Sequence, residues 1–182
     1  DNTYRELESA QKNLEKVRQA ATQNDSDAEA KEQELKENNM LLGRTDVTGE
    51  GVEILLEDAK DTANSLNPSE QIIHYDDIQL VINELKNAGA EAIEVNGQRL
   101  VSTSAITCEG NIIKINGERV GSPFNIKAIG SQDMLYGALT RAGSIIDWIA
   151  RYGNTATVTK SDNVTIAKYS GTLGYEYLKE DK

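Results

Sequence analysis

The sequence predicts an α+β protein in which a long polar helix precedes one compact α/β domain. Two observations support this fold class. Residues 1–42 contain neither proline nor glycine, and they repeat an apolar column every seven residues. From residue 43 onward, glycines and Asn-Gly pairs separate short apolar runs, and two segments have the i, i+3, i+4, i+7 spacing of amphipathic helices. The expected parts are a helical stalk at 1–43, an α/β domain at 44–169 and a loose C-terminal tail at 170–182.

The expected stalk carries half of a coiled-coil seam. The companion column, at positions 4, 11, 18, 25, 32 and 39, is polar apart from Tyr4. A continuous helix of this length would reach ~60 Å, but residues 24–27 are a plausible break. Two interpretations stay open: a spacing stalk that forms a weak homodimer, or a solvated and partly frayed helix. The apolar column consists of Leu7, Leu14, Ala21, Ala28, Leu35 and Leu42.

The first half of the domain reads as strand, helix, strand. A Gly-Glu-Gly turn at 49–51 leads into an apolar strand at 52–57, and a polar surface loop follows at 58–73. Asp76 or Asp77 can cap a helix that Gly89 ends. A second strand follows at 92–95. The apolar face of the helix consists of Ile78, Val81, Ile82 and Leu85.

The second half of the domain contains hairpins and a further strand–helix–strand unit. Asn-Gly pairs at 96–97 and 116–117 are strong hairpin signals, because both residues tolerate positive φ. A strand at 125–129 leads into one helix from Ser131 to Gly153, and a hairpin of 155–159 with 164–168 closes the domain. This order predicts a ferredoxin-like split βαβ domain with inserted β-hairpins, with two helices on one face of a mainly antiparallel sheet.

The charge balance excludes several partners. The chain has 182 residues, 19 Lys+Arg against 30 Asp+Glu, and a net charge of −11. An acidic surface repels the phosphates of nucleic acid and of anionic lipid, so we expect no nucleic-acid partner and no basic lipid contact. With one cysteine, Cys108, no intramolecular disulfide is possible, and the single histidine, His74, excludes most zinc sites. We expect no metal and no cofactor.

No catalytic motif is assembled in the sequence. Phosphate-binding loops and the nucleophile elbow are absent, and the S-x-x-K and S-D-N matches at 9–12 and 161–163 lack the accompanying K-T-G. His74 reads as a structural residue at a helix entry, and Cys108 as a small buried hydrophobe. Trp148 and Tyr152 are expected to anchor the core rather than to bind sugar. The sequence therefore predicts a protein that is not an enzyme.

A short internal repeat suggests one candidate site. Residues 94–100 match residues 114–120, each with an Asn-Gly pair followed by an arginine. The plainer interpretation is two independent hairpins with the same turn chemistry. The alternative is that Arg99 and Arg119 project side by side and hold an anion or a partner carboxylate.

A second candidate site is acidic. Asp58, Asp61, Asp76 and Asp77 would gather around a divalent cation if the loop at 58–73 folded back over the helix start. Helix capping plus a solvated loop is the plainer account of the same residues.

The domain sequence resembles a known family. The similarity lies in residues 73–78, in 85–100 with Ala-Gly-Ala-Glu-Ala-Ile and Asn-Gly-Gln-Arg-Leu, and in 104–111, and spans roughly residues 45–168. These stretches are similar to the YlxW/YlxX-like family, domain of unknown function 881 (DUF881, UPF0749). The resemblance implies a bacterial protein with an N-terminal membrane anchor, a helical spacer and a domain outside the cytoplasm, encoded near cell-division and cell-wall genes. It implies no reaction and no catalytic residues.

Two functions are therefore expected as alternatives. The first is an extracytoplasmic interaction or scaffold module that contacts envelope or division proteins and reaches the membrane only through an anchor upstream of residue 1. The second is a domain that senses a small molecule or a peptidoglycan fragment. A deep pocket near Arg99, Arg119 and the Asp58/Asp76 loop would favour the second, whereas a flat apolar patch or an open sheet edge would favour the first.

Overall fold

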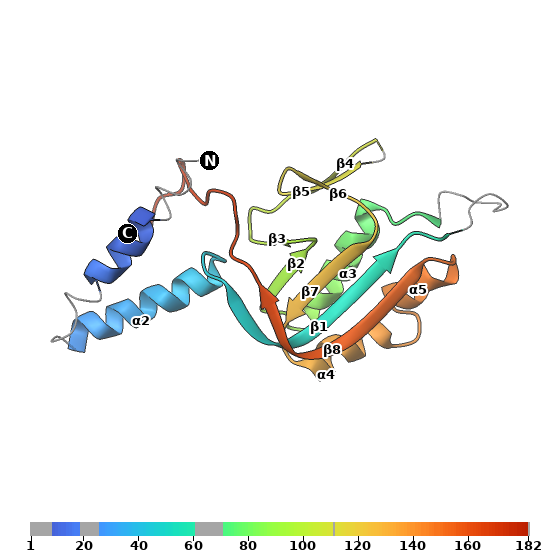
Figure 1. The fold of residues 1–182 in the computed structure, drawn as a ribbon, viewed down its shortest axis with the longest axis horizontal. Coiled ribbons are helices and arrows are strands. Elements are labelled where there is room, and N and C mark those ends of the chain that lie inside the picture. The colour runs from blue at the N-terminus through green and yellow to red at the C-terminus, as the bar shows by residue number, and fades with distance from the viewer. Residues whose placement is uncertain (1–8, 19–25, 61–70, 111, 182) are drawn as a thin grey trace. The chain divides into compact units, whose positions relative to one another are not determined.

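A computed structural model describes residues 9–18, 26–60, 71–110 and 112–181 (Figure 1). The chain divides into two units, Asp1–Leu41 and Leu42–Lys182. In the first unit, residues 9–18 are helical and α2 spans Ser26–Leu41. The predicted break at 24–27 falls partly outside the described residues, and a single continuous stalk helix stays a prediction. No helix in the described ranges has both the length and the apolar composition needed to cross a bilayer.

The second unit is an α+β domain with two antiparallel sheets. The larger sheet has the strand order β3-β2-β7-β1-β8. β7 lies between β1 and β2 and is antiparallel to both, so β1 and β2 run parallel to each other. The strands of this sheet are β1 (Val47–Glu57), β2 (Ala92–Val95), β3 (Gln98–Arg99), β7 (Phe124–Ile129) and β8 (Thr155–Ile166).

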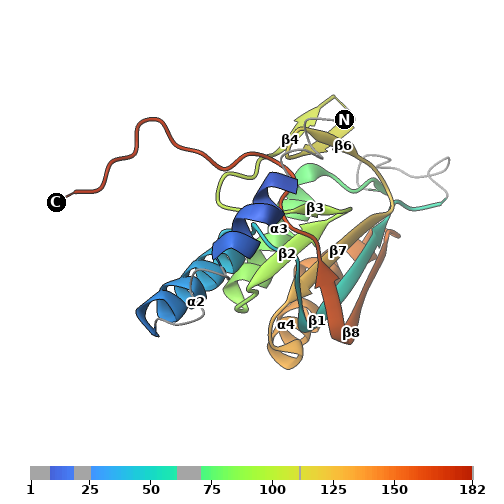
Figure 2. The same ribbon diagram turned by 60° about the vertical axis from the view of Figure 1, so that its left-hand side comes forward.

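Three helices cover one face of the larger sheet, as Figures 1 and 2 show. They are α3 (Tyr75–Asn87), α4 (Gln132–Thr140) and α5 (Ile145–Arg151). The predicted face of α3 is confirmed, because Ile78, Val81, Ile82 and Leu85 are all buried there. They share one core with Val52, Ile54 and Leu56 of β1, Leu135 and Leu139 of α4, and Ile149 of α5.

The smaller sheet has the order β4-β5-β6 and packs beside α3. Gln79 of α3 donates from Nε2 to the Ile106 carbonyl at 3.2 Å. Ile113 and Ile115 reach from this sheet into the main core. The Asn-Gly turns are confirmed at both positions, with positive φ at all four residues. The strands are β4 (Ile106–Glu109), β5 (Ile112–Ile115) and β6 (Glu118–Val120).

The predicted Gly-Glu-Gly turn at 49–51 is wrong, because these residues lie inside β1. A Cβ on Gly51 would lie 1.9 Å from the Ala128 carbonyl oxygen of the neighbouring strand, and one on Gly49 would lie 2.9 Å from the Ile129 side chain. The two glycines therefore allow close strand approach and do not reverse the chain.

The predicted closing hairpin is also wrong, because β8 is one continuous strand. It pairs with β1 from Thr155 to Ile166, with a bulge that sets residues 162 and 163 opposite Glu50. The polar Ser-Asp-Asn stretch resembles turn sequence but accommodates this bulge. A bulge reverses the inside–outside alternation, so Val158 faces the helices while Val164 and Ile166 join a small cluster with Ala92 and Ile129.

The single predicted helix from 131 to 153 is two helices. Arg141 has an extended backbone (φ −62°, ψ 151°), and Gly143 has φ +75°. Ser144 then starts α5, and its hydroxyl accepts a hydrogen bond from the Asp147 amide at 3.2 Å. An N-cap serine preceded by a left-handed glycine ends one helix and begins the next.

Candidate functional site

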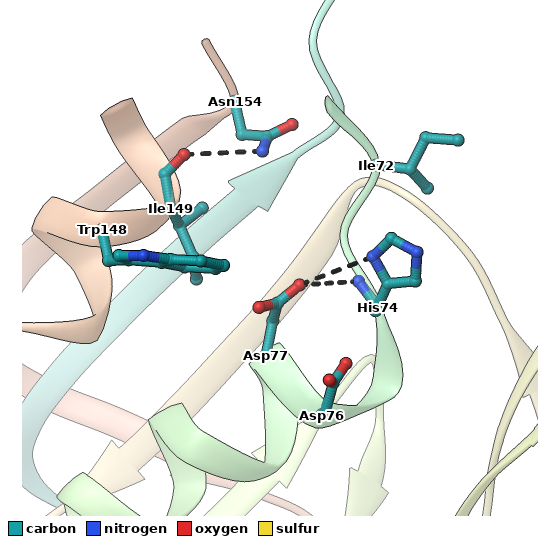
Figure 3. Close-up of a pocket in the computed structure, with 7 residues that line it drawn as sticks. All are labelled: Ile72, His74, Asp76, Asp77, Trp148, Ile149 and Asn154. Carbon is teal, nitrogen blue, oxygen red and sulfur yellow. Dashed lines mark hydrogen bonds and ion pairs between the residues drawn. The ribbon is translucent and has the colours of Figure 1, made fainter. Parts of the chain in front are cut away.

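A small open cavity lies where the N-terminus of α3 faces α5 (Figure 3). Its volume is about 210 Å³. Polar groups come from the start of α3, and an indole ring comes from α5, on the opposite wall. The lining residues are Ile72, His74, Asp76, Asp77, Trp148, Ile149 and Asn154.

The cap of α3 positions the acidic wall. The predicted N-cap at Asp76 or Asp77 is corrected, because His74 is the N-cap and Asp77 is the third helical residue. The His74 amide donates to Asp77 Oδ2 at 2.9 Å, while Asp77 also lies 3.8 Å from the imidazole Nδ1. A carboxylate in this position satisfies an amide that the helix itself leaves without an acceptor.

Asp77 is a buried carboxylate with one unused oxygen. Asp77 is only 9% exposed to solvent. Burial raises its pKa above the ordinary value; the bond from the His74 amide opposes this shift, and the neighbouring Asp76 charge adds to it. Among the described residues no donor bonds the other oxygen, Oδ1. Asp76, one position earlier, is exposed.

Trp148 forms the opposite wall. Its side chain is 46% exposed, so the expectation that it anchors the core is wrong. Its edge-to-face contact with Tyr152, at 4.9 Å between ring centroids, orients the indole. The sequence contained the signal, because Trp148 lies off the apolar stripe that Ile145, Ile146 and Ile149 continue. A large aromatic residue outside that stripe faces outward.

Asn154 and Asp58 hold the rim of the cavity in place. Asn154 is buried; its Oδ1 accepts from the Ala59 amide at 3.1 Å, and its Nδ2 donates to the Ile149 carbonyl at 3.4 Å. Asp58 Oδ1 accepts from the Ile73 amide at 2.8 Å. Asp58 therefore fixes the segment before α3 and does not line the cavity. Sequence reasoning missed Asn154, which has no distinctive sequence context.

The acidic residues do not form a cation site in the described part of the chain. No group of three or more His, Cys, Asp or Glu side chains is arranged there to hold a metal ion. Asp76 and Asp77 are together at the cavity, Asp58 is bound to backbone, and Asp61 lies outside the described residues.

The structure separates the two arginines. Arg99 lies in β3 of the larger sheet and is 4% exposed, whereas Arg119 lies in β6 of the smaller sheet and is exposed. Burial lowers the pKa of Arg99, and the nearby Glu94 charge opposes that shift. The arginines thus do not project side by side from one surface, and the described structure contains two separate hairpins with a common turn chemistry.

Cys108 is exposed, so its expected burial is wrong. It lies near the end of the edge strand β4, and its thiol contacts the Gly110 carbonyl at 2.7 Å. Ile106, at the start of β4, packs against the main core, whereas Cys108, two residues further along, is exposed although its cross-strand partner Ile113 is buried.

The fold and the cavity define a two-sheet α+β domain with a small cavity lined by acidic and aromatic side chains. The chain belongs to a family described as "Bacterial protein of unknown function (DUF881)", which matches residues 34–179.

Several relatives support the same assignment. UPF0749 protein YlxW of Bacillus subtilis (strain 168) is 37% identical over 132 residues, covering 72% of this chain and 57% of that protein. UPF0749 protein Rv1825 of Mycobacterium tuberculosis (strain H37Rv) is 28% identical over 149 residues, covering 79% of this chain and 47% of that protein. The chain thus spans about half the length of these relatives.

A solved structure has a similar fold. The crystal structure of an uncharacterized conserved protein from Mycobacterium tuberculosis matches with a TM-score of 0.66 and 24% identity, covering 81% of this chain and 99% of that one. At this identity the likeness concerns the fold alone, and it supports the mixed α+β class with antiparallel sheets.

Proposed function

We propose that this domain is a non-catalytic interaction module, which contacts a protein partner through the surface around Trp148. The supporting observation is that exposed large apolar side chains gather at the acidic cavity. Ile72 is 47% exposed and Trp148 46% exposed, and both line the cavity; the exposed Tyr75 begins α3 beside it. Exposed Trp and Tyr are the residue types that dominate protein interfaces energetically.

The size of the cavity favours a protein partner over a free ligand. Sites for small molecules are typically ~300–1,000 Å³ and enclose most of the ligand. At about 210 Å³, this cavity suits one inserted side chain, with the surrounding apolar surface covered by the rest of the partner.

A photo-crosslinking residue tests this proposal. It is placed at Tyr75 in the full-length protein in intact cells, with the matched control at Met134, an exposed apolar residue of α4. The expected result is a discrete adduct from position 75 that disappears when Trp148→Ala is added, and no such adduct from position 134. Identical adducts from both positions, insensitive to Trp148→Ala, would contradict the proposal.

The cellular setting is part of the same proposal. The family resemblance supports a bacterial envelope protein with a membrane anchor upstream of this segment, acting beside division or cell-wall proteins, with a stalk that pairs weakly. Protease added to wall-stripped cells should remove the domain from membrane-bound full-length protein. Protection equal to that of a cytosolic marker would contradict an extracytoplasmic position.

The free edge of β8 is a second surface for the same role. It is the outer strand of the larger sheet and has no strand partner on that side among the described residues. Its bulge and Lys160 are features that discourage strand pairing, so this edge carries less weight than the Trp148 surface.

Binding of a peptidoglycan fragment is the second candidate. An exposed indole opposite two carboxylates offers a stacking face and acceptors for polar groups of such a fragment. Purified fragments titrated into the protein should then change the Trp148 emission saturably, and Trp148→Ala should abolish their binding by calorimetry.

We also infer that the larger sheet is a variant of the ferredoxin-like split βαβ arrangement. The order β2-β7-β1-β8, with α3 joining β1 to β2 and with α4 and α5 between β7 and β8, supports this inference.

A further inference from the structure

The charged side chains that line the cavity favour a positively charged group over a negatively charged one. Its charged lining side chains are the carboxylates of Asp76 and Asp77, and neither lysine nor arginine lines it. The whole chain carries a net charge of −11. An anionic group would be repelled both locally and at long range, whereas a cation would be attracted.

The buried carboxylate adds a local requirement. Asp77 uses Oδ2 to hold the His74 amide, and Oδ1 has no hydrogen-bond donor among the described residues. Oδ1 is not among the buried side-chain atoms that lack a partner, so it is accessible from the cavity, and a positively charged donor forms the strongest hydrogen bond to it. His74 is the one lining side chain that can carry a positive charge, and it lies 3.8 Å from Oδ2, the oxygen that is already engaged. Oδ1 is therefore left for a positively charged donor from a partner.

The aromatic wall favours the same ligand. Tryptophan is the strongest cation–π acceptor among the side chains, and it binds a cation within about 6 Å of the ring. In the described chain, the ring contact of Trp148 is with Tyr152, and the cation–π contact formed internally is elsewhere, with Lys160 over Tyr136 at 5.1 Å. Figure 3 shows the indole edge-on, across the cavity from Asp77, with the edge of its ring toward that residue.

The form of the acidic wall favours an ammonium over a guanidinium. Arginine binds best to a carboxylate with both oxygens free for its fork of donors, whereas lysine is a compact point charge. Asp77 has one oxygen already engaged. The apolar stem of a lysine would also lie against Ile72 and Ile149, which line the same cavity.

On these grounds we propose that the cavity receives a lysine side chain of a protein partner, with its ammonium over a face of the Trp148 ring and within reach of the carboxylates of Asp76 and Asp77. This inference rests on the proposed interaction surface and names the group that the surface recognises. The lysine is the central anchor, and Ile72 and Tyr75 contact the residues that flank it.

The chain provides its own reporter. Trp148 is the only tryptophan in the sequence, so selectively excited indole emission reports this cavity alone. The probe is Nα-acetyl-lysine methylamide, and the comparison is the same molecule acetylated at Nε, which keeps the stem and removes the charge. The expected result is a saturable emission change with affinity about tenfold higher for the charged probe, since charge–aromatic and charge–carboxylate contacts combine.

Variants then assign the contact. Asp76→Asn should weaken binding of the charged probe by roughly three- to tenfold, without changing the response to the acetylated one. Asp133→Asn is the matched control, an exposed carboxylate on α4 that does not line the cavity, and should change neither.

Three outcomes would overturn the inference: equal responses to both probes, no response to either, or binding of an ammonium-free glycan fragment in preference to the lysine probe. The last would favour the peptidoglycan candidate. The crosslinking experiment at Tyr75 distinguishes the two levels. If the Trp148-dependent adduct forms but the lysine probe does not bind, the proposed interaction surface is supported and the assignment of its ligand as lysine is wrong.

Discussion

The two Asn-Gly hairpins of the domain have nearly the same sequence and different surroundings. In the first, β2 and β3 flank Asn96-Gly97; in the second, β5 and β6 flank Asn116-Gly117. The turns are alike, with φ of 47° and 80° in the first and 55° and 85° in the second. Local sequence is sufficient for this geometry, because asparagine and glycine both tolerate the left-handed region.

The arginines after the turns differ completely. Arg99 stands across from Glu94 and is buried with it, while Glu94 also lies 3.8 Å from Lys127. Arg119 stands across from Lys114, a like charge, and is exposed. Lys114 instead pairs with Glu109 at 2.7 Å. The role of each arginine thus depends on its cross-strand neighbour and on the cover over its sheet, which the repeated motif does not encode.

The largest difference in stability is expected at these arginines. Arg99→Ala should lower the free energy of unfolding by about 2 kcal/mol, because it empties the space of a buried side chain and removes the positive charge near Glu94. The loss is limited, because Nε and Nη1 of Arg99 are buried without a hydrogen-bond partner. Arg119→Ala should change it by less than about 0.5 kcal/mol. Urea unfolding of both variants measures the difference.

A double variant identifies the cause. Glu94→Gln combined with Arg99→Met removes both charges and keeps the volume, so it should recover most of the loss. Arg99→Met alone keeps the stem and leaves Glu94 charged; if it recovers as much stability as the double variant, packing of the Arg99 stem, rather than its charge, stabilises the sheet.

Substitutions of the two turn asparagines should differ in their effect on stability, but by less than substitutions of the two arginines. Asn96 accepts from the Asn125 amide at 2.7 Å and donates to the Pro123 carbonyl at 3.2 Å, whereas Asn116 makes one side-chain bond, to the Arg99 carbonyl at 2.9 Å. Glycine keeps the positive φ and removes only these bonds. Asn96→Gly should therefore cost about 2 kcal/mol and Asn116→Gly about 1 kcal/mol in chemical unfolding. Equal costs would contradict this ranking.

Substitution of either turn glycine by alanine should have the same effect on stability. A Cβ would meet no atom within 4 Å at either Gly97 or Gly117, so the left-handed backbone is the whole penalty. Gly97→Ala and Gly117→Ala should each lower the free energy of unfolding by about 1 kcal/mol. A clearly larger loss at one position, measured by thermal unfolding, would show that the turns are strained differently.

The distinction between features set by local sequence and features set by neighbouring elements explains which expectations from sequence were right. The buried face of α3 and the Asn-Gly turns follow from periodicity and φ preference within a few residues. The glycines of β1, the bulge in β8 and the break before Ser144 depend on a neighbouring strand or on a cap, so local pattern misassigned them. Of the carboxylates grouped from the sequence, Asp76 and Asp77 line one cavity, whereas Asp58 bonds to backbone. The opposite wall was missed, because Trp148 was assigned to the core although it lies off the apolar stripe of its helix.

The smallest expected change in stability comes from a substitution that gives the second hairpin an opposite-charge pair across its strands, as the first hairpin has. Arg119→Glu places a carboxylate across from Lys114 and removes a like-charge pair. Cross-strand charge pairs contribute roughly 0.2–1 kcal/mol, and this one is exposed and must share Lys114 with Glu109. The stability should therefore rise by about 0.3 kcal/mol, while Arg119→Gln, which only removes the repulsion, should give about half of that gain. Urea midpoints at low and high salt separate the cases, because an ionic gain shrinks when salt screens it. A loss of stability in Arg119→Glu that salt does not change would mean that the arginine stem packs on the sheet, and that the two hairpins differ less than their exposure indicates.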